Sequence, residues 1–144
     1  MPLDALPSEF LFTITAQTAE KPPVMIPAGP AGTRVIVTAM SGEFAGPKLR
    51  GKVADAAGGD WVTIKADGTM SLDVRLVLQT NDDAAIYMTY TGVGRRNPDG
   101  SMVIRTVPRF ETADERYTWL NAVQAVAHGT TATGSVTYDV YGLL

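Results

Sequence analysis

The chain has 144 residues, of which 45% are hydrophobic and 19% charged, a composition typical of one soluble globular domain. Twelve basic and fifteen acidic residues give a formal charge of −3, so we expect no nucleic-acid partner. The chain has no cysteine, which excludes disulfides, thiolate nucleophiles and cysteine metal ligands. The start MPLDALPSEFLFT lacks the features of a targeting segment, and no apolar run approaches the roughly 18 residues of a membrane span. These patterns predict a cytoplasmic protein with no membrane partner.

Short extended runs separated by turn residues dominate the first third of the chain. In 10–17, apolar and polar residues alternate, and Phe10, Phe12, Ile14 and Ala16 fall on one predicted face. The segment 20–32 contains four prolines, which predicts a loop or an edge connection, because proline cannot donate to a strand ladder. The β-branched run that follows predicts a second strand over 33–41.

The rest of the chain continues this pattern and adds one helix. The remaining predicted strands occupy 48–56, 61–66, 69–80, 84–92, 101–111, 123–131 and 134–144. Asp67-Gly68 is a strong hairpin signal between two of these runs. Thr112 and Glu115 have capping-box spacing, which predicts a short helix over 113–124.

About eight short strands and one helix in the C-terminal third predict a single antiparallel β-barrel domain over 1–144. Sheets of this many antiparallel strands usually close, because exposed edges invite aggregation. A barrel of about eight strands has an interior large enough for one small ligand. The sequence therefore predicts a mainly β protein with an internal small-molecule pocket.

Several motifs between about Val35 and the C-terminus, roughly three quarters of the chain, resemble a known family. The segments are FAGPKLRGKV, GGDW, ADGTMSLDVRLVLQTNDDAAIY, PRFETADERYTWLN and VTYDVYGL. In this order they resemble the domain of unknown function 3237, also called the UPF0311 family. The resemblance implies a compact, commonly self-associating β-barrel. One departure is Asp82-Asp83-Ala84, where such sequences tend to have an acidic residue followed by glycine.

Asp73 and Arg75 are two residues apart in a predicted strand, so their side chains leave the same face. If the opposite Leu/Val face packs elsewhere, the pair points into the barrel. There, Asp73 would move a proton and Arg75 would hold an anionic or carbonyl oxygen. The alternative is that this face is simply solvated.

Asp60 and Trp61 form a second candidate. An apolar neighbour raises the pKa of a carboxyl and makes Asp60 a usable acid or base. Alternatively, Asp60 caps the preceding glycine turn and Trp61 is a core residue. The hairpin register predicts that Trp61 lies near Asp73 or Arg75 and either packs over the Arg75 stem or shields Asp73.

Arg109 and Glu111 share a face if the strand stays extended. In one interpretation Arg109 binds a substrate oxygen and Glu111 acts as the base beside it. In the other, the two residues form an ion pair where the strand meets the predicted helix. Trp119 and Asn121, at the far end of the predicted helix, suit a pocket wall. The alternative for these two is a core residue and a helix C-cap.

Tyr138 and Tyr141 lie on opposite faces of the last strand, so one of them faces the interior and is a substrate-binding candidate. His128 is the only histidine, which argues against a zinc site, and no carboxylate spacing predicts another metal. The GxSxG, GxxxxGK[ST] and GxGxxG motifs are absent, so we expect no metal and no organic cofactor.

These candidates predict an acid–base enzyme of the isomerase, cyclase, lyase or hydratase type. Its predicted substrate is a small carbonyl-bearing or aromatic molecule. The predicted catalytic residues are Asp73, Arg75, Glu111 and Asp60, and the predicted substrate-binding residues are Trp61, Arg109, Trp119, Asn121 and Tyr138. There are two alternatives. The barrel binds a small molecule without transforming it, or its interior is filled with side chains and has no ligand site. The apolar face of Leu72, Val74, Leu76 and Leu78 also predicts a homodimer.

Overall fold

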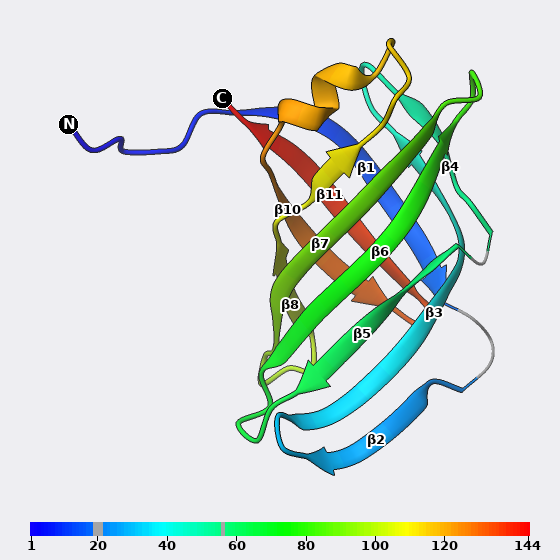
Figure 1. Cartoon of the computed structure of the whole chain (residues 1–144). Helices are drawn as coiled ribbons and strands as arrows, with labels where there is room; N and C mark the ends of the chain where they lie inside the picture. The colour runs from blue at the N-terminus through cyan, green and yellow to red at the C-terminus, as the bar shows by residue number, and fades with distance from the viewer. Residues whose placement is uncertain (19–21, 56) are drawn as a thin grey trace.

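The computed structural model describes residues 1–18, 22–55 and 57–144, and most of these residues lie in β-strands (Figure 1). The strands are β1 (Ser8–Thr18), β2 (Val24–Gly29), β3 (Gly32–Ala45), β4 (Arg50–Val53), β5 (Gly58–Ile64), β6 (Met70–Thr80), β7 (Ala85–Arg96), β8 (Met102–Thr106), β9 (Arg109–Glu111), β10 (Ala125–Ala132) and β11 (Ser135–Leu143). All of them belong to one antiparallel sheet. In the described residues no helix has the length and apolar character of a membrane span.

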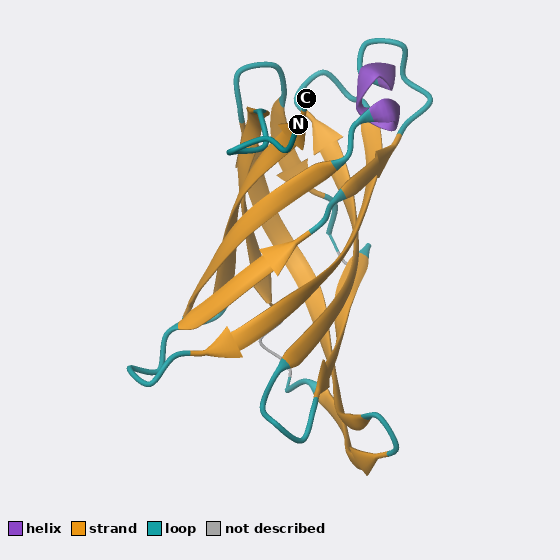
Figure 2. Ribbon diagram, turned by 90° about the vertical axis from the view of Figure 1, so that its left-hand side faces the viewer, coloured by secondary structure: helices purple, strands orange, loops and turns teal. Residues whose placement is uncertain are grey.

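The strand pairings return to their starting point. Neighbours follow the order β6-β5-β3-β1-β11-β10-β8-β7, and β7 also pairs with β6 over ten residue pairs from Met70↔Gly94 to Gln79↔Ala85. The sheet is therefore barrel-like, with the strands tilted around a common interior (Figure 2). Because the pairings form a ring, the inward side chains of every strand face the same enclosed space.

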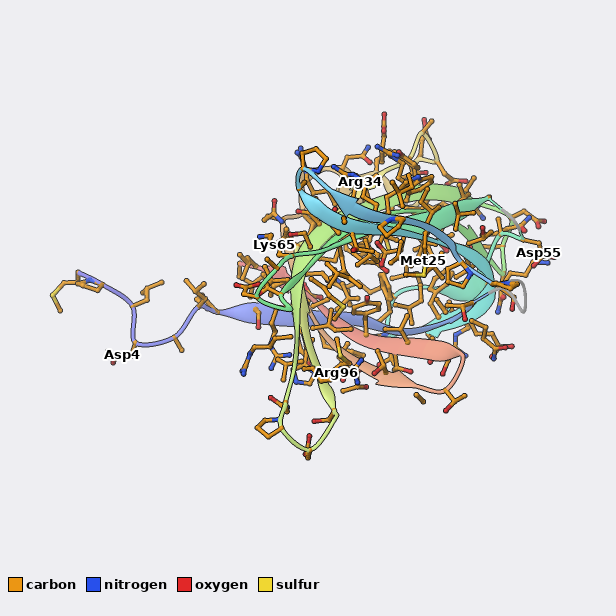
Figure 3. All side chains as sticks on the ribbon, turned by 90° about the horizontal axis from the view of Figure 1, so that it is seen from below. Asp4, Met25, Arg34, Asp55, Lys65 and Arg96 are labelled. Carbon is orange, nitrogen blue, oxygen red and sulfur yellow. The ribbon has the colours of Figure 1, made fainter. Side chains whose placement is uncertain are left out.

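Three strands lie outside this ring. β2 pairs with β3, β4 bridges β3 and β6, and β9 pairs with β7 after Pro108 ends the ladder of β8. The proline-rich segment 20–32, described from Pro22 onward, contains the edge strand β2, as its prolines predicted. β2 lies at the lower end of the sheet, where Met25 is seen in Figure 3, whereas the N-terminal residues extend away from the sheet. The run expected over 48–56 is shorter than predicted, and residue 56 lies outside the described residues.

Alternation along the strands decides which residues fill the interior. In β6, Leu72, Val74, Leu76 and Leu78 are buried, whereas the residues between them are exposed or half-buried. In β1, the register shifts between Phe10 and Phe12, which places Leu11 and Phe12 both in buried positions. Phe10 is consequently 38% exposed. The prediction that Phe10 shares a face with Phe12, Ile14 and Ala16 is wrong. The bulge between Phe10 and Phe12 changes which face of the sheet the side chains before it point to.

One end of the interior is filled by aromatic and aliphatic side chains. Phe12 packs edge-on against Phe44 and Phe110, with ring centroids 5.5 and 5.9 Å apart. Leu120, fully buried, covers this end from the short 3₁₀ turn η1 (Thr118–Ala122), which Figure 2 shows at the top of the sheet. This end is therefore a packed core, and among the described residues the interior space for a ligand lies at the other end.

The helix predicted over 113–124 is wrong, because only the single turn η1 forms. The Thr112 hydroxyl, expected to cap the helix, donates instead to the Ala85 carbonyl of β7 at 2.8 Å. The side-chain amide of Asn121 bonds both the N–H and the C=O of Thr112, each at 2.9 Å. The first bond fastens the start of the segment to β7, and the other two join its two ends to each other, in place of the helical hydrogen bonds that the capping-box spacing predicted.

The hairpin predicted at Asp67-Gly68 is confirmed. The N–H of Lys65 donates to the Thr69 carbonyl at 2.9 Å, and Gly68 has the left-handed φ of +85°. A second turn, between β6 and β7, places Asp83 at a φ of +68°. Asp83 occupies the turn in which the family resemblance implies a glycine, a residue that adopts this conformation without steric cost.

Phe10 and Phe12, which flank Leu11 on β1, provide a test of the bulge. We expect Phe12→Ala to lower the free energy of unfolding by about 3–5 kcal/mol, because it leaves a cavity in the packed end. Phe10→Ala removes a ring that is 38% exposed and touches Tyr141, so its cost is expected to stay below about 1.5 kcal/mol. Urea unfolding of both variants measures the difference, and equal costs would contradict the described register.

Candidate functional site

A pocket of about 260 Å³ occupies the end of the interior opposite η1. It runs from exposed residues at the end of β1 and the β10–β11 turn to buried residues such as Leu76 and Tyr138. Most of its lining is aliphatic or methionine: Ala16, Val37, Val62, Met70, Leu72, Val74, Leu76, Met102, Ile104, Ala132 and Val136. A space of this size holds more than one or two waters, so the interior is not filled solid with side chains.

Asp60 is the carboxylate that lines this pocket. It belongs to β5, whose alternation turns Asp60 and Val62 inward and Trp61 outward. In the ladder Asp60 is paired with Val37 of β3 and Val74 of β6. Its Oδ1 accepts a hydrogen bond from the backbone N–H of Asp73 at 3.1 Å. The side chain thus replaces a ladder partner on β6, while its remaining acceptor capacity stays available.

Burial in the mostly apolar pocket raises the pKa of Asp60 from its ordinary 3.8 to about 6. The hydrogen bond from the Asp73 N–H lowers this pKa in part, and the negative charge of the Asp73 side chain raises it further. A carboxyl with a pKa of about 6 is mostly ionised at neutral pH and remains able to exchange a proton there.

Two tyrosines contribute hydroxyl groups to the buried part of the pocket. Tyr90 of β7 and Tyr138 of β11 are buried, and their rings meet edge to face with centroids 5.3 Å apart. Burial raises the pKa of Tyr138 to about 12, and burial together with the neighbouring Tyr138 holds the pKa of Tyr90 well above its usual range. Both residues therefore keep their hydroxyl protons at neutral pH and can act as hydrogen-bond donors.

The position of the Tyr138 ring depends on Gly129, its cross-strand partner on β10. A Cβ at position 129 would lie 2.7 Å from Cδ1 of Tyr138, well inside van der Waals contact. The ring therefore lies directly over the glycine, and a larger residue at this position would displace it.

Asp73 and Arg75 lie on the outer face of the sheet, so the expectation that they point into the barrel is wrong. The Leu/Val face of β6 fills the interior itself, which leaves the charged face to solvent. Trp61 also lies outside, 38% exposed, and the Arg75 guanidinium lies 5.5 Å from the centre of its ring. Of the two arrangements predicted for Trp61, packing over Arg75 or shielding Asp73, this contact supports the first.

The remaining predicted site residues are also outside the pocket. One hollow on the outer surface is lined by Asp73, Arg75 and Arg109, and a neighbouring hollow by Arg109, Glu111 and Asn121. The side chains of these residues are exposed, so water screens their charges.

Trp119 lies at the packed end of the molecule. It is half-buried against the core, with the Lys48 ammonium 5.0 Å from the centre of its ring. Of the nine predicted site residues, the pocket therefore brings together Asp60 and Tyr138. Tyr138, and not Tyr141, is the inward tyrosine of β11.

Sequence reasoning missed Tyr90, Met70 and Met102. The signal for Tyr90 was present, since it continues the buried alternation of Ile86 and Met88 along β7. Met70 and Met102 stand at the first positions of β6 and β8, where periodicity is weakest. His128 is exposed, and within the described ranges no three His, Cys, Asp or Glu side chains are grouped to hold a metal ion.

The apolar face on which the predicted homodimer was based is part of the interior. Leu72, Val74, Leu76 and Leu78 are at most 7% exposed within a single chain. That face cannot form an interface between copies, and self-association stays a prediction that follows from the family resemblance.

The fold and sequence are similar to those of several proteins. A β-barrel-like protein from Acinetobacter baumannii matches with a TM-score of 0.90 at 25% identity, covering 99% of both chains. A UPF0311 protein from Bradyrhizobium diazoefficiens is 30% identical over 96% of this chain and 97% of its own length.

A fungal relative has a named activity. The hydroalkoxylation enzyme phnH of Penicillium herquei is 30% identical over 81% of this chain and 70% of its own length. The structure of an enzyme from the same organism matches with a TM-score of 0.72 at 25% identity, covering all of both chains.

The family comparison covers nearly the whole chain. The family model described as "Protein of unknown function (DUF3237)" matches residues 7–143, which include every strand that lines the pocket. The chain therefore belongs to the DUF3237 family.

Proposed function

We propose that this protein is an acid–base enzyme that transforms a small molecule held inside a closed eight-stranded barrel, with Asp60 moving the proton. The observation that carries this proposal is the Asp60 carboxyl, turned into an otherwise largely apolar pocket, with a pKa of about 6. Groups that exchange protons near neutral pH, placed in a cavity, are characteristic of catalytic sites.

In this proposal each polar group has a separate role. The Asp60 carboxylate accepts a proton from an O–H or activated C–H bond of the substrate. The Tyr90 and Tyr138 hydroxyls, which stay protonated, donate hydrogen bonds to a substrate oxygen as negative charge develops on it. The protonated Asp60 then returns the proton to carbon or oxygen, which completes an isomerisation, cyclisation, lyase or hydration step without net change in protons.

The fungal relative favours the cyclisation or addition class. Hydroalkoxylation adds an O–H bond across a carbon–carbon double bond, so one proton leaves oxygen and one arrives at carbon. A single carboxyl that alternates between its two protonation states can perform both transfers. The named activity belongs to phnH of Penicillium herquei, and the pocket geometry supports extending its reaction class to this chain.

The second candidate function is binding without chemistry. It is favoured by the lining, which is mainly aliphatic and in which the described residues provide one carboxylate and neither a second carboxylate nor an arginine. Turnover of a bound substrate distinguishes the two functions.

The first prediction concerns Asp60 itself. With an alkenyl phenol as the probe substrate, we expect Asp60→Asn to lower kcat by roughly two to four orders of magnitude, because amides do not exchange protons at neutral pH. Asp83→Asn is the matched control, since Asp83 is exposed in the β6–β7 turn, outside the pocket lining, and its loss should leave turnover nearly unchanged. Product formation is followed by liquid chromatography. Full activity in Asp60→Asn would refute the catalytic role, and binding without turnover in the wild type would favour the second function.

The second prediction separates the two tyrosines of β11. We expect Tyr138→Phe to reduce kcat by about 10- to 1,000-fold with a smaller change in KM, because a hydrogen bond to developing charge acts mainly in the transition state. Tyr141→Phe removes a hydroxyl from the outer face and should have no such effect. Equal kinetics of both variants would exclude Tyr138 from the chemistry.

The third prediction tests the buried charge without a substrate. Between pH 3.8 and about 6 the Asp60 carboxyl ionises in the unfolded chain but keeps its proton in the folded one. Unfolding then releases a proton, so the contribution of Asp60 to stability is fully present below pH 3.8 and lost as the pH rises through about 6. We expect wild type to lose stability relative to Asp60→Asn over this range, measured by urea unfolding. A constant difference would show that Asp60 is not desolvated.

A further inference from the structure

We infer that the pocket selects its ligand by charge: it accepts an uncharged or cationic apolar molecule and rejects anions, and Asp60 is the residue that discriminates. This inference rests on the proposed function insofar as the ligand occupies this pocket. It adds the class of ligand and the physical reason for the choice.

The first observation is the charge of the lining. None of the described lining residues is Lys, Arg or His. The polar groups toward the exposed end are neutral side chains, among them Gln17, Thr18, Thr131 and Ser135. At neutral pH the only ionised side chain among the described lining residues is therefore the Asp60 carboxylate.

The second observation is that nearby cationic side chains are held on the outer face. Arg75 lies over the ring of Trp61, and Nη1 of Arg34 donates to the Thr63 hydroxyl at 3.1 Å. Both partners belong to β5, the strand that carries Asp60, but they point to the opposite side of the sheet. These arginines cannot supply a counter-charge inside the pocket without breaking their outer contacts.

The third observation is what Asp60 still lacks. Its Oδ1 accepts one backbone hydrogen bond, from Asp73, whereas a carboxylate has about four acceptor positions. The hydroxyls of Tyr90 and Tyr138 can donate to a neutral oxygen of the ligand. They carry no positive charge, so they cannot neutralise the negative charge of Asp60. A ligand that brings an O–H, N–H or ammonium group satisfies Asp60, and a carboxylate or phosphate repels it.

The size of the effect follows from Coulomb's law. A second negative charge about 4 Å from Asp60, at an effective dielectric constant of about 20, corresponds to a loss of affinity on the order of 10²–10³-fold. Partial solvation of the half-buried Asp60 reduces this value, so we expect at least about a tenfold loss.

The test uses three naphthalene probes that differ in one substituent: naphthylmethylamine, naphthylmethanol and naphthoate, all of the same ring isomer. Binding at neutral pH is measured by isothermal titration calorimetry with wild type and Asp60→Asn. Glu43→Gln is the matched control, because it removes one negative charge from an exposed position on β3 outside the pocket. Met102→Trp and, in case it does not fold, Met70→Trp fill the pocket from two different strands.

We expect wild type to bind the amine and the alcohol at least about tenfold more tightly than naphthoate. Asp60→Asn should bring the alcohol and naphthoate to within about threefold of each other, whereas Glu43→Gln should leave the wild-type ratio unchanged. Naphthoate binding as tightly as the alcohol, or a ratio unaffected by Asp60→Asn, would overturn the charge selection while leaving the pocket as the site. If no probe binds, or if the pocket-filling variants bind all three as wild type does, both this inference and the proposed function are wrong.

Discussion

The pairing of β6 with β7 is the constraint on which the rest of the structure depends. It joins the two ends of a path of strands that would otherwise have open edges, and it does so over ten residue pairs. Once the ring of pairings is closed, each strand has one enclosed face and one solvated face. The lining of the pocket is set by which residue of each alternating pair faces inward.

The interior divides into two parts with different chemistry. At the end near η1, the rings of Phe12, Phe44 and Phe110 fill the space, and the segment bearing η1 is fastened over them by hydrogen bonds of Thr112 and Asn121. At the other end, the aliphatic lining leaves a pocket of about 260 Å³ in which Asp60 is exposed to the ligand space. The well-packed end contributes stability, and this allows the other end to contain a cavity and a desolvated carboxyl, both of which cost stability.

The environment of Asp60 combines two effects that oppose each other. Burial disfavours the carboxylate, whereas the hydrogen bond from the Asp73 N–H stabilises it. The result is a pKa of about 6 instead of a permanently protonated acid or an ordinary surface carboxylate. In the proposed function the same uncompensated charge would serve both proton transfer and discrimination against anions, so both proposals depend on one side chain.

The amino-acid sequence alone determined the class of the fold and most of its strands. Alternation in 69–80, the Asp67-Gly68 turn and the prolines of 20–32 are local signals, and the corresponding elements formed where these signals predicted them. The family resemblance also came from the sequence, because ordered motifs are a property of the chain and need no coordinates. The helix over 113–124 was predicted from equally local spacing and did not form, since Thr112 and Asn121 found partners that are distant in sequence or across the segment.

Only the tertiary structure decided which face of each strand is inside. The alternation in β6 is the same whether Asp73 and Arg75 or Leu72 and Val74 face the interior, and the closure of the ring selects the apolar set. The bulge at Phe10 and the contact between Tyr90 and Tyr138 likewise depend on register between strands far apart in the chain. Alternation of apolar and polar residues identifies the two faces of a strand. Which face belongs to the core is decided by burial, and burial depends on all the neighbouring strands together.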